Sequence, residues 1–328
     1  MTHLLRIDDN ELYQIVNPGN YEELKKYESV DIYTKDDNNE PILIKVATED
    51  FNKEYPLISS DNTLMNLFIR LKDRISLIRR EQNQLNVDLK KSLKIDMPKA
   101  KTILTSLVDV TLSEPRTELL NEIKETIDLM LREYLSNPEV IKHLVQVSIH
   151  DYSTSLHLAN CMLFCFGYAH YSKYSKKDMK DLGLAALLHD IGKLEIPDYL
   201  LQASRKLTPD EFKIIKRHTT AGYSLIESSD FSKAVKLATI EHHERLDGTG
   251  YPNGRQYLHE TSKVIGIIDV FEALTHWRPY KDEMNPLEAL KFIKEKEVDL
   301  GRFDEKIFKS FAQSLVGMKL APNAGVAQ

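Results

Sequence analysis

The stretch LLHDIGKLEIP, Leu187 to Pro197, places His189 and Asp190 side by side at the end of an apolar run. Gly192 and Lys193 follow two and three residues after Asp190. Both polar side chains of the pair are costly to bury without partners, and both are good metal ligands. The same pair could also lie at the exposed end of a helix, where water satisfies it. The other histidines and acids of the chain therefore decide between a metal site and a surface pair.

The bulk composition is typical of a soluble globular protein. The chain has 328 residues, of which 42% are hydrophobic and 29% charged, and is long enough for about two domains with their own cores. The net charge of −6 provides no basic field that would attract a nucleic-acid polymer or an anionic membrane. An anionic ligand would therefore have to be held by local cations or by a metal.

The N-terminus and the cysteines point to the cytoplasm. The first residues, MTHLLRIDDNELYQ, carry acids too early and an apolar run too short for a signal peptide. The apolar stretch 156–172, which contains no Asp, Glu, Lys or Arg but two His and an Asn, is shorter than a transmembrane helix. Cys161 and Cys165 cannot form a disulfide framework, and we interpret them as small core residues. We expect a cytoplasmic protein with no membrane span.

The sequence divides into three parts. Residues 1–60 combine β-like runs such as 41–46 with polar turns, and predict a small mixed α/β module that regulates or docks. The signal or protein partner of this module is unknown. Residues 61–118 predict a helical linker. Residues 119–328 contain one amphipathic helix after another, several of them beginning with Ser, Thr or Asn before Pro. The expected fold class is α+β overall, with an all-α C-terminal domain.

The linker contains a heptad seam, in which apolar residues alternate spacings of four and three. Its members are Leu64, Phe68, Leu71, Ile75, Ile78, Gln82, Leu85 and Leu89. The seam fits a homodimeric coiled coil through 64–89, and it fits equally an amphipathic helix packed on its own chain. In the dimer, this helix would relay a signal from the N-terminal module.

Seven side chains of the C-terminal domain form a candidate metal site. Apolar helical runs lead repeatedly to a histidine near their ends, and one carboxylate lies within an apolar helix, where an unpaired acid is rare. Five imidazoles and two carboxylates exceed the four ligands of one zinc ion and suit two ions of iron or manganese type. The candidates are His157, His189, Asp190, His218, His242, His243 and Asp269.

Three motifs resemble the HD-GYP family, a branch of the HD superfamily of metal-dependent phosphohydrolases. They are HDIGKLEIP, HHERLDGTGYPNG at 242–254 and IIDVFEALTHWRPYK at 267–281, and LTPDEFKIIKRHTTAG between them also matches. The resemblance covers about residues 140–320. It implies an all-α HD-type catalytic domain over 119–328 that hydrolyses cyclic di-GMP at a centre of two or three irons.

The resemblance also implies how the metal ligands divide. His157, His189, Asp190 and Asp269 would hold one ion, and Asp190, His218, His242 and His243 the other, with Asp190 as the bridge. A hydroxide between the ions would attack the phosphodiester bond. Family members with a third metal carry a Glu where this chain has Ser153, so we expect two ions per chain. Iron is expected, and manganese suits the same ligands.

Four residues match the family's substrate contacts. Lys193 would place an ammonium on the phosphate and assist catalysis, Arg278 and Lys281 would grip the phosphate, and Tyr251 of the GYP loop would contact the ligand. The products would be linear pGpG, GMP or both. Because the loop 255–263 departs from the family pattern, two alternatives stay open. The protein could be a catalytically weak cyclic di-GMP receptor, or a phosphohydrolase for another nucleotide.

Overall fold

The computed structural model describes residues 4–6, 12–16, 25–35, 41–47, 66–114, 120–147, 149, 153–278 and 282–320. The chain forms two compact units, residues 1–81 and 82–328. Their boundary lies within helix α2 (Leu71–Ser92), and the three-part division at residues 60 and 118 stays a prediction.

The N-terminal unit contains a five-stranded antiparallel sheet. Its neighbours follow the order β1-β2-β5-β3-β4, and Val30, Ile32 and Ile69 belong to the small core beside it. The elements are β1 (Leu4–Arg6), β2 (Leu12–Val16), the 3₁₀ turn η1 (Lys25–Tyr27), β3 (Ile32–Lys35), β4 (Pro41–Lys45) and β5 (Leu67–Arg70). The β-like run at 41–46 is thus confirmed as β4.

Strand β5 corrects the predicted start of the heptad helix. Leu67, Phe68 and Ile69 are all buried, and they lie in a strand that pairs with β2 and β3. Three consecutive buried residues need apolar surroundings on both faces, which a central strand has and a one-sided amphipathic helix lacks. The helix therefore begins at Leu71. Leu64, the first seam position, lies outside the described residues.

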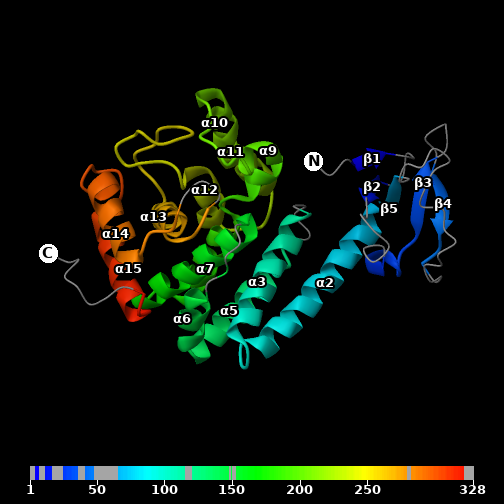
Figure 1. Cartoon of the computed structure of the whole chain (residues 1–328), viewed down its shortest axis with the longest axis horizontal. Coiled ribbons are helices and arrows are strands. Elements are labelled where there is room, and N and C mark those ends of the chain that lie inside the picture. The colour runs from blue at the N-terminus through cyan, green and yellow to red at the C-terminus, as the bar shows by residue number, and fades with distance from the viewer. Residues whose placement is uncertain are drawn as a thin grey trace. The chain divides into compact units, whose positions relative to one another are not determined.

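The described part of the C-terminal unit is helical and contains no strand, as the sequence predicted. Figure 1 shows the helices gathered around α7, with α13, α14 and α15 following late in the chain. They are α3 (Met97–Leu112), α5 (Ile123–Ser136), α6 (Glu139–Gln146), α7 (Thr154–Tyr171), α8 (Lys176–Leu188), η2 (Ile191–Glu195), α9 (Asp198–Leu201), α10 (Pro209–Lys216), α11 (His218–Ile226), α12 (Lys233–Glu241), α13 (Glu260–Thr275), α14 (Pro286–Ile293), the π-helical turn η3 (Lys294–Val298) and α15 (Glu305–Gly317).

Helix α7 is the centre of this unit. Every residue from Ser155 to Ala169 is buried, because the helix packs against α3, α6, α8, α13 and α15. A helix that is apolar all round is typical of a domain core. Its first turn carries His157 into that core. Among the described residues, no helix is long and apolar enough to cross a bilayer.

The C-terminal half of α2 packs on its own chain. Leu89 belongs to the main core, Leu85 packs against it, and the buried Gln82 donates a hydrogen bond from Nε2 to Thr111 Oγ1 of α3 at 2.9 Å. The contacts of these three seam positions agree with the second interpretation, an amphipathic helix that packs on its own chain. The homodimer stays a prediction.

Candidate metal centre

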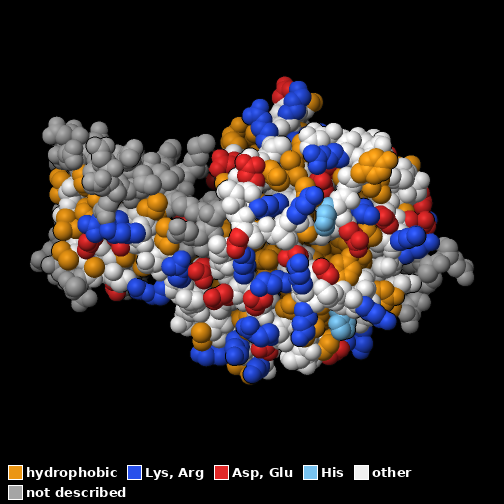
Figure 2. Space-filling view, turned by 180° about the vertical axis from the view of Figure 1, so that it is seen from behind, with side chains coloured by type: hydrophobic (Ala, Val, Ile, Leu, Met, Phe, Trp, Pro, Cys, Tyr) orange, Lys and Arg blue, Asp and Glu red, His pale blue; other side chains and the backbone are white. Residues whose placement is uncertain are grey.

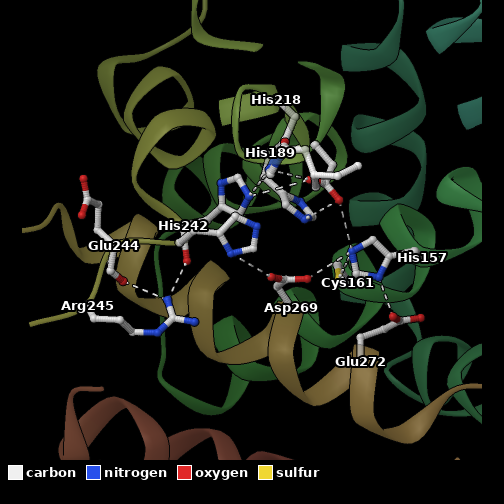
Figure 3. A network of polar contacts seen from close by, with 12 residues as sticks. His157, Cys161, His189, His218, His242, Glu244, Arg245, Asp269 and Glu272 are labelled. Carbon is white, nitrogen blue, oxygen red and sulfur yellow. Dashed lines mark hydrogen bonds and ion pairs between the residues drawn. The ribbon is translucent and has the colours of Figure 1, made fainter. Parts of the chain in front are cut away.

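The seven residues predicted as metal ligands converge on one place in the C-terminal unit. Figure 3 labels five of them, His157, His189, His218, His242 and Asp269. The seven residues come from helix ends and one helix interior. Their positions are His157 in the first turn of α7, His189 at the C-cap of α8 with Asp190 next to it, His218 at the start of α11, His242 at the C-cap of α12 with His243 after it, and Asp269 within α13.

Asp190 lies between two groups of imidazoles. Its Oδ1 is 3.2 Å from His218 Nε2 and 3.7 Å from His242 Nε2. Its Oδ2 is 3.6 Å from His189 Nε2 and 3.7 Å from His157 Nε2. Each carboxylate oxygen thus faces a different pair of rings. A carboxylate with this arrangement can serve two cations, since each of its oxygens has lone pairs.

Asp269 occupies a second position between rings. Its Oδ1 is 3.4 Å from His157 Nε2, and its Oδ2 is 3.8 Å from His243 Nδ1. Asp190, His218, His242 and His243 each offer one ligand atom within 4.8 Å of the others. The arrangement thus brings all seven predicted residues within reach of a centre with two carboxylates.

The hydrogen bonds of three histidines direct lone pairs into the centre. The Nδ1 atoms of His189, His218 and His242 lie 2.9, 2.7 and 3.0 Å from backbone carbonyl oxygens. A carbonyl only accepts, so each Nδ1 carries the proton and each Nε2 keeps its lone pair. His218 Nε2 and His242 Nε2 then face each other at 3.2 Å. His189 Nε2 and Asp190 Oδ1 are buried without a hydrogen bond. Lone pairs this close repel one another unless a cation lies between them.

Burial favours the neutral form of three imidazoles of the centre, His189, His218 and His243. It lowers the pKa of His189 to about 3 and that of His218 to about 4. Burial would raise the pKa of Asp190, but Lys193 and the neighbouring imidazoles outweigh it and hold that pKa well below the usual range. Neutral imidazoles and an ionised carboxylate are the states that bind metal. The residues present therefore fit a metal centre.

The pKa of His157 is shifted in the opposite direction to those of His189 and His218. Burial would lower its pKa, but Cys161, Glu272 and Asp269 around it raise the pKa well above the usual value. The Sγ of Cys161 is 3.8 Å from both ring nitrogens and so packs against the ring. Burial raises the pKa of this thiol to about 11. Its Sγ lies within 4.8 Å of ligand atoms of His157 and His189, so the three side chains form a second group that could hold a metal.

Glu272 positions His157 from outside the centre. Its Oε2 contacts His157 Nδ1, and its Oε1 accepts a hydrogen bond from Asn160 Nδ2 at 3.0 Å. Arg278 Nη2 is 3.4 Å from the same Oε2. Carboxylates that hold the second nitrogen of a ligating histidine fix the orientation of its ring. The side chain of Glu272 on α13 is therefore long enough to reach His157 on α7.

Glycines bring the backbones of the ligand-bearing segments together. A Cβ on Gly192 of η2 would lie 1.9 Å from the carbonyl oxygen of His218, and one on Gly266 of α13 would lie 2.7 Å from that of His242. Neither distance is possible for a real side chain. The Gly that follows the His-Asp pair is thus required by direct contact between η2 and α11.

Two buried acids that sequence reasoning missed shape the loop after His243. Glu244 accepts hydrogen bonds from the backbone N–H groups of Asn253 (2.7 Å) and Arg255 (3.0 Å). Glu241 accepts from the backbone of His259 and, at 2.8 Å, from Ser262 Oγ. The signal was present in the sequence, because these acids flank the histidine pair in EHHE.

Ser153, where we expected no third-metal ligand, caps a helix. Its hydroxyl accepts a hydrogen bond from the backbone N–H of Leu156 at 3.1 Å, and it is the N-cap of α7. A hydroxyl in this role satisfies one of the free donors of the helix end.

A cleft of about 1210 Å³ opens onto the centre. Asp190, His218, His243 and Asp269 line it, and so do the predicted substrate contacts Lys193, Tyr251 and Arg278. Lys193 Nζ lies 2.5 Å from Asp190 Oδ2, and the Tyr251 ring lies 4.7 Å from the His243 ring. Leu200, Leu201, Ile215, Val270 and Leu274 provide apolar walls. Lys281 lies outside the described residues.

Comparisons with known proteins agree with this geometry. Residues 157–307 match the family described as "HD domain". A cyclic di-GMP phosphodiesterase of Pseudomonas aeruginosa is 31% identical over 202 residues, which are 61% of this chain and 46% of that protein. The 3'3'-cGAMP-specific phosphodiesterase 1 of Vibrio cholerae is 40% identical over 131 residues, 39% of this chain and 30% of that protein. The chain thus spans less than half the length of these curated relatives.

A solved structure has the same fold. The HDG"Y"P protein of Bdellovibrio bacteriovorus superposes with a TM-score of 0.59 at 18% identity, covering 88% of this chain and 95% of that one. Residues 157–307 match the family described as an HD domain, and the motifs in this part of the chain are similar to those of HD-GYP proteins.

Proposed function

We propose that the protein is a metal-dependent phosphodiesterase that hydrolyses cyclic di-GMP at a centre of two metal ions. The observation that carries the proposal is the position of Asp190, whose two oxygens face two different pairs of imidazole nitrogens. The names of the relatives supply the substrate class. We further propose that it acts in the cytoplasm, with iron or manganese as the metal and with the seam of α2 as a homodimer contact.

The ligands divide between the two ions around Asp190. With Asp190, His157, His189 and Asp269 would coordinate one ion. With the same Asp190, His218, His242 and His243 would coordinate the other. Ser153 stands where a carboxylate would serve a third ion, and its hydroxyl is engaged in capping α7, so we propose two ions.

The cations of the cleft would act on the substrate directly. When bound, the two ions would act as Lewis acids on the phosphodiester and supply an activated water. Lys193, which lines the cleft, would hold a non-bridging phosphate oxygen while it contacts Asp190. Arg278 would offer its guanidinium to the phosphate from a position held by Glu272. Lys281 remains a predicted second cation of this grip.

The cleft accommodates a ligand larger than a mononucleotide. Its volume of about 1210 Å³ exceeds the range that is usual for small-ligand sites. Tyr251 and the apolar walls supply surface for bases. Because one relative carries the name of a 3'3'-cGAMP-specific enzyme, this mixed cyclic dinucleotide is the second candidate substrate.

Hydrolysis and metal content measured in one sample test the proposal. Protein purified without oxygen would be assayed with cyclic di-GMP and with 3'3'-cGAMP, with pGpG and GMP separated by chromatography. We expect turnover with about two metals per chain, and loss of at least one metal and of turnover in Asp190→Ala. The exposed Asp210→Ala is the matched control and should keep both. Two metals and tight ligand binding without turnover would instead indicate a receptor.

A further inference from the structure

The cleft has an aromatic wall that the metal chemistry does not use. Phe212 of α10 lines it beside Tyr251, and the two ring centroids are 6.3 Å apart with an angle of 78° between the ring planes. Tyr251 in turn lies against the His243 ring, with 31° between their planes. A row of three rings therefore leads from the metal centre to Phe212.

Helix α10 keeps Phe212 out of the core. All eight residues of α10 are described, and none of them is buried; Phe212 itself is 45% exposed. Thr208 and Glu211 form a capping box at the start of the helix, and Arg205 pairs with Glu211 at 2.6 Å. Figure 2 shows α10 projecting from the surface at the top of the view. The capping interactions at its N-terminus thus stabilise α10. The ring of Phe212 therefore stays accessible to a ligand in the cleft.

Lys216 fixes the two rings relative to each other. Its ammonium nitrogen lies 5.0 Å from the centroid of Phe212 and 4.7 Å from that of Tyr251. A cation over both aromatic faces is attracted to each of them. The side chain therefore stabilises the angle between the rings and adds positive charge to this side of the cleft.

We propose that Phe212 contributes to the binding of purine nucleotides by stacking on a base of the nucleotide whose phosphate lies at the metal centre. The inference rests on the proposed function, because it takes the ligand to be a purine nucleotide. Every base has a flat π face, and stacking on an aromatic side chain contributes to binding largely independently of base identity. Tyr251 lies between Phe212 and the centre, so the ring of Phe212 is placed for the base rather than for the phosphate.

Substitutions of Phe212 in the metal-loaded, full-length protein test the stacking. Phe212→Leu keeps an apolar side chain of similar size but removes the flat face, and Phe212→Tyr keeps the face. We expect Phe212→Leu to raise KM for cyclic di-GMP about tenfold with kcat within twofold, and Phe212→Tyr to stay close to the unaltered protein. Phe292→Leu on α14, a position 38% exposed, is the matched control and should change neither constant. An unchanged KM in Phe212→Leu overturns the proposal.

Binding of two simple probes separates this inference from the proposed reaction. GMP and ribose 5-phosphate share a phosphate and a ribose, but only GMP has a base. Calorimetry should show that the protein prefers GMP, and that Phe212→Leu reduces this preference about tenfold. If cyclic dinucleotides are not hydrolysed but Phe212→Leu still reduces the preference for GMP, the proposed reaction is wrong and the proposed stacking on Phe212 is supported. Equal binding of both probes by the unaltered protein overturns the stacking residue whatever the turnover.

Discussion

A Cβ atom on Gly192 would lie 1.9 Å from the carbonyl oxygen of His218, and the nearby backbone of Gly222 leaves no room for relaxation. We expect Gly192→Ala to lower the free energy of unfolding by about 3 kcal/mol and to displace His218, with loss of bound metal. Urea denaturation and metal analysis measure both effects. Gly317→Ala in α15, whose Cβ would meet no atom within 4 Å, is the control and should gain up to about 1 kcal/mol. Similar results for both variants would contradict the contact.

Glu272 acts through His157, so its substitution should weaken the centre without removing a ligand. Glu272→Gln keeps the shape of the side chain but loses the charge that contacts His157 Nδ1 and Arg278. We expect metal affinity or activity to fall by about 10- to 100-fold. Titration of the metal-free protein with Fe²⁺ or Mn²⁺ measures the affinity. Unchanged affinity and activity would show that the carboxylate does not orient the ring.

At the scale of elements, α10 depends on one acid at its first turn. Hydrogen bonds from Arg205 and from the backbone of Thr208 lower the pKa of Glu211 to about 2. The folded-state pKa is below the unfolded value, so this stabilisation is complete above about pH 4.5 and is lost as the pH falls towards 2. Hydrogen-exchange protection of α10 should therefore decrease over that range. Glu211→Gln should lack this dependence, and Asp210→Asn should retain it.

A second prediction at this scale concerns Gln82, the polar residue in the heptad seam of α2. Gln82 is buried, its Nε2 donates to Thr111, and its Oε1 has no hydrogen bond. We expect Gln82→Leu to change the free energy of unfolding by about 1 kcal/mol or less, since it removes one hydrogen bond and one unsatisfied oxygen together. In a homodimeric coiled coil, the same change would strengthen association, because a polar seam residue weakens it. Sedimentation velocity of both proteins distinguishes the two cases.

At the scale of the whole molecule, the metals should stabilise the fold. Lone pairs of buried imidazoles face one another across short distances, so removal of the cations leaves repulsion within the core of the C-terminal unit. We expect chelation to lower Tm, by an amount equivalent to about 3 kcal/mol for each ion at a hundredfold excess over its Kd. Calorimetry with and without EDTA, followed by return of Fe²⁺ or Mn²⁺, measures this. An unchanged Tm would argue against a resident metal.

The sequence predicted the parts of this molecule whose chemistry is carried by residue type and spacing. The seven converging side chains and the helical C-terminal unit followed from histidines at helix ends and from apolar periodicity. Strand β5 was missed, because the apolar residues of LFIR fit both a heptad pattern and a strand that is buried on both faces. Glu241 and Glu244 were passed over, because the sequence shows that they flank the histidine pair but does not show that they are buried. Packing between distant segments decides these cases.

The close contacts of Gly192 and Gly266 also have a consequence for variation among related chains. Each glycine touches the backbone of a histidine-bearing segment, so a side chain at either position would disturb the centre while every ligand is retained. A search that looks only for the metal ligands would then classify such a chain as active. We expect the identity of these two glycines to be as diagnostic of a working domain as the histidines themselves.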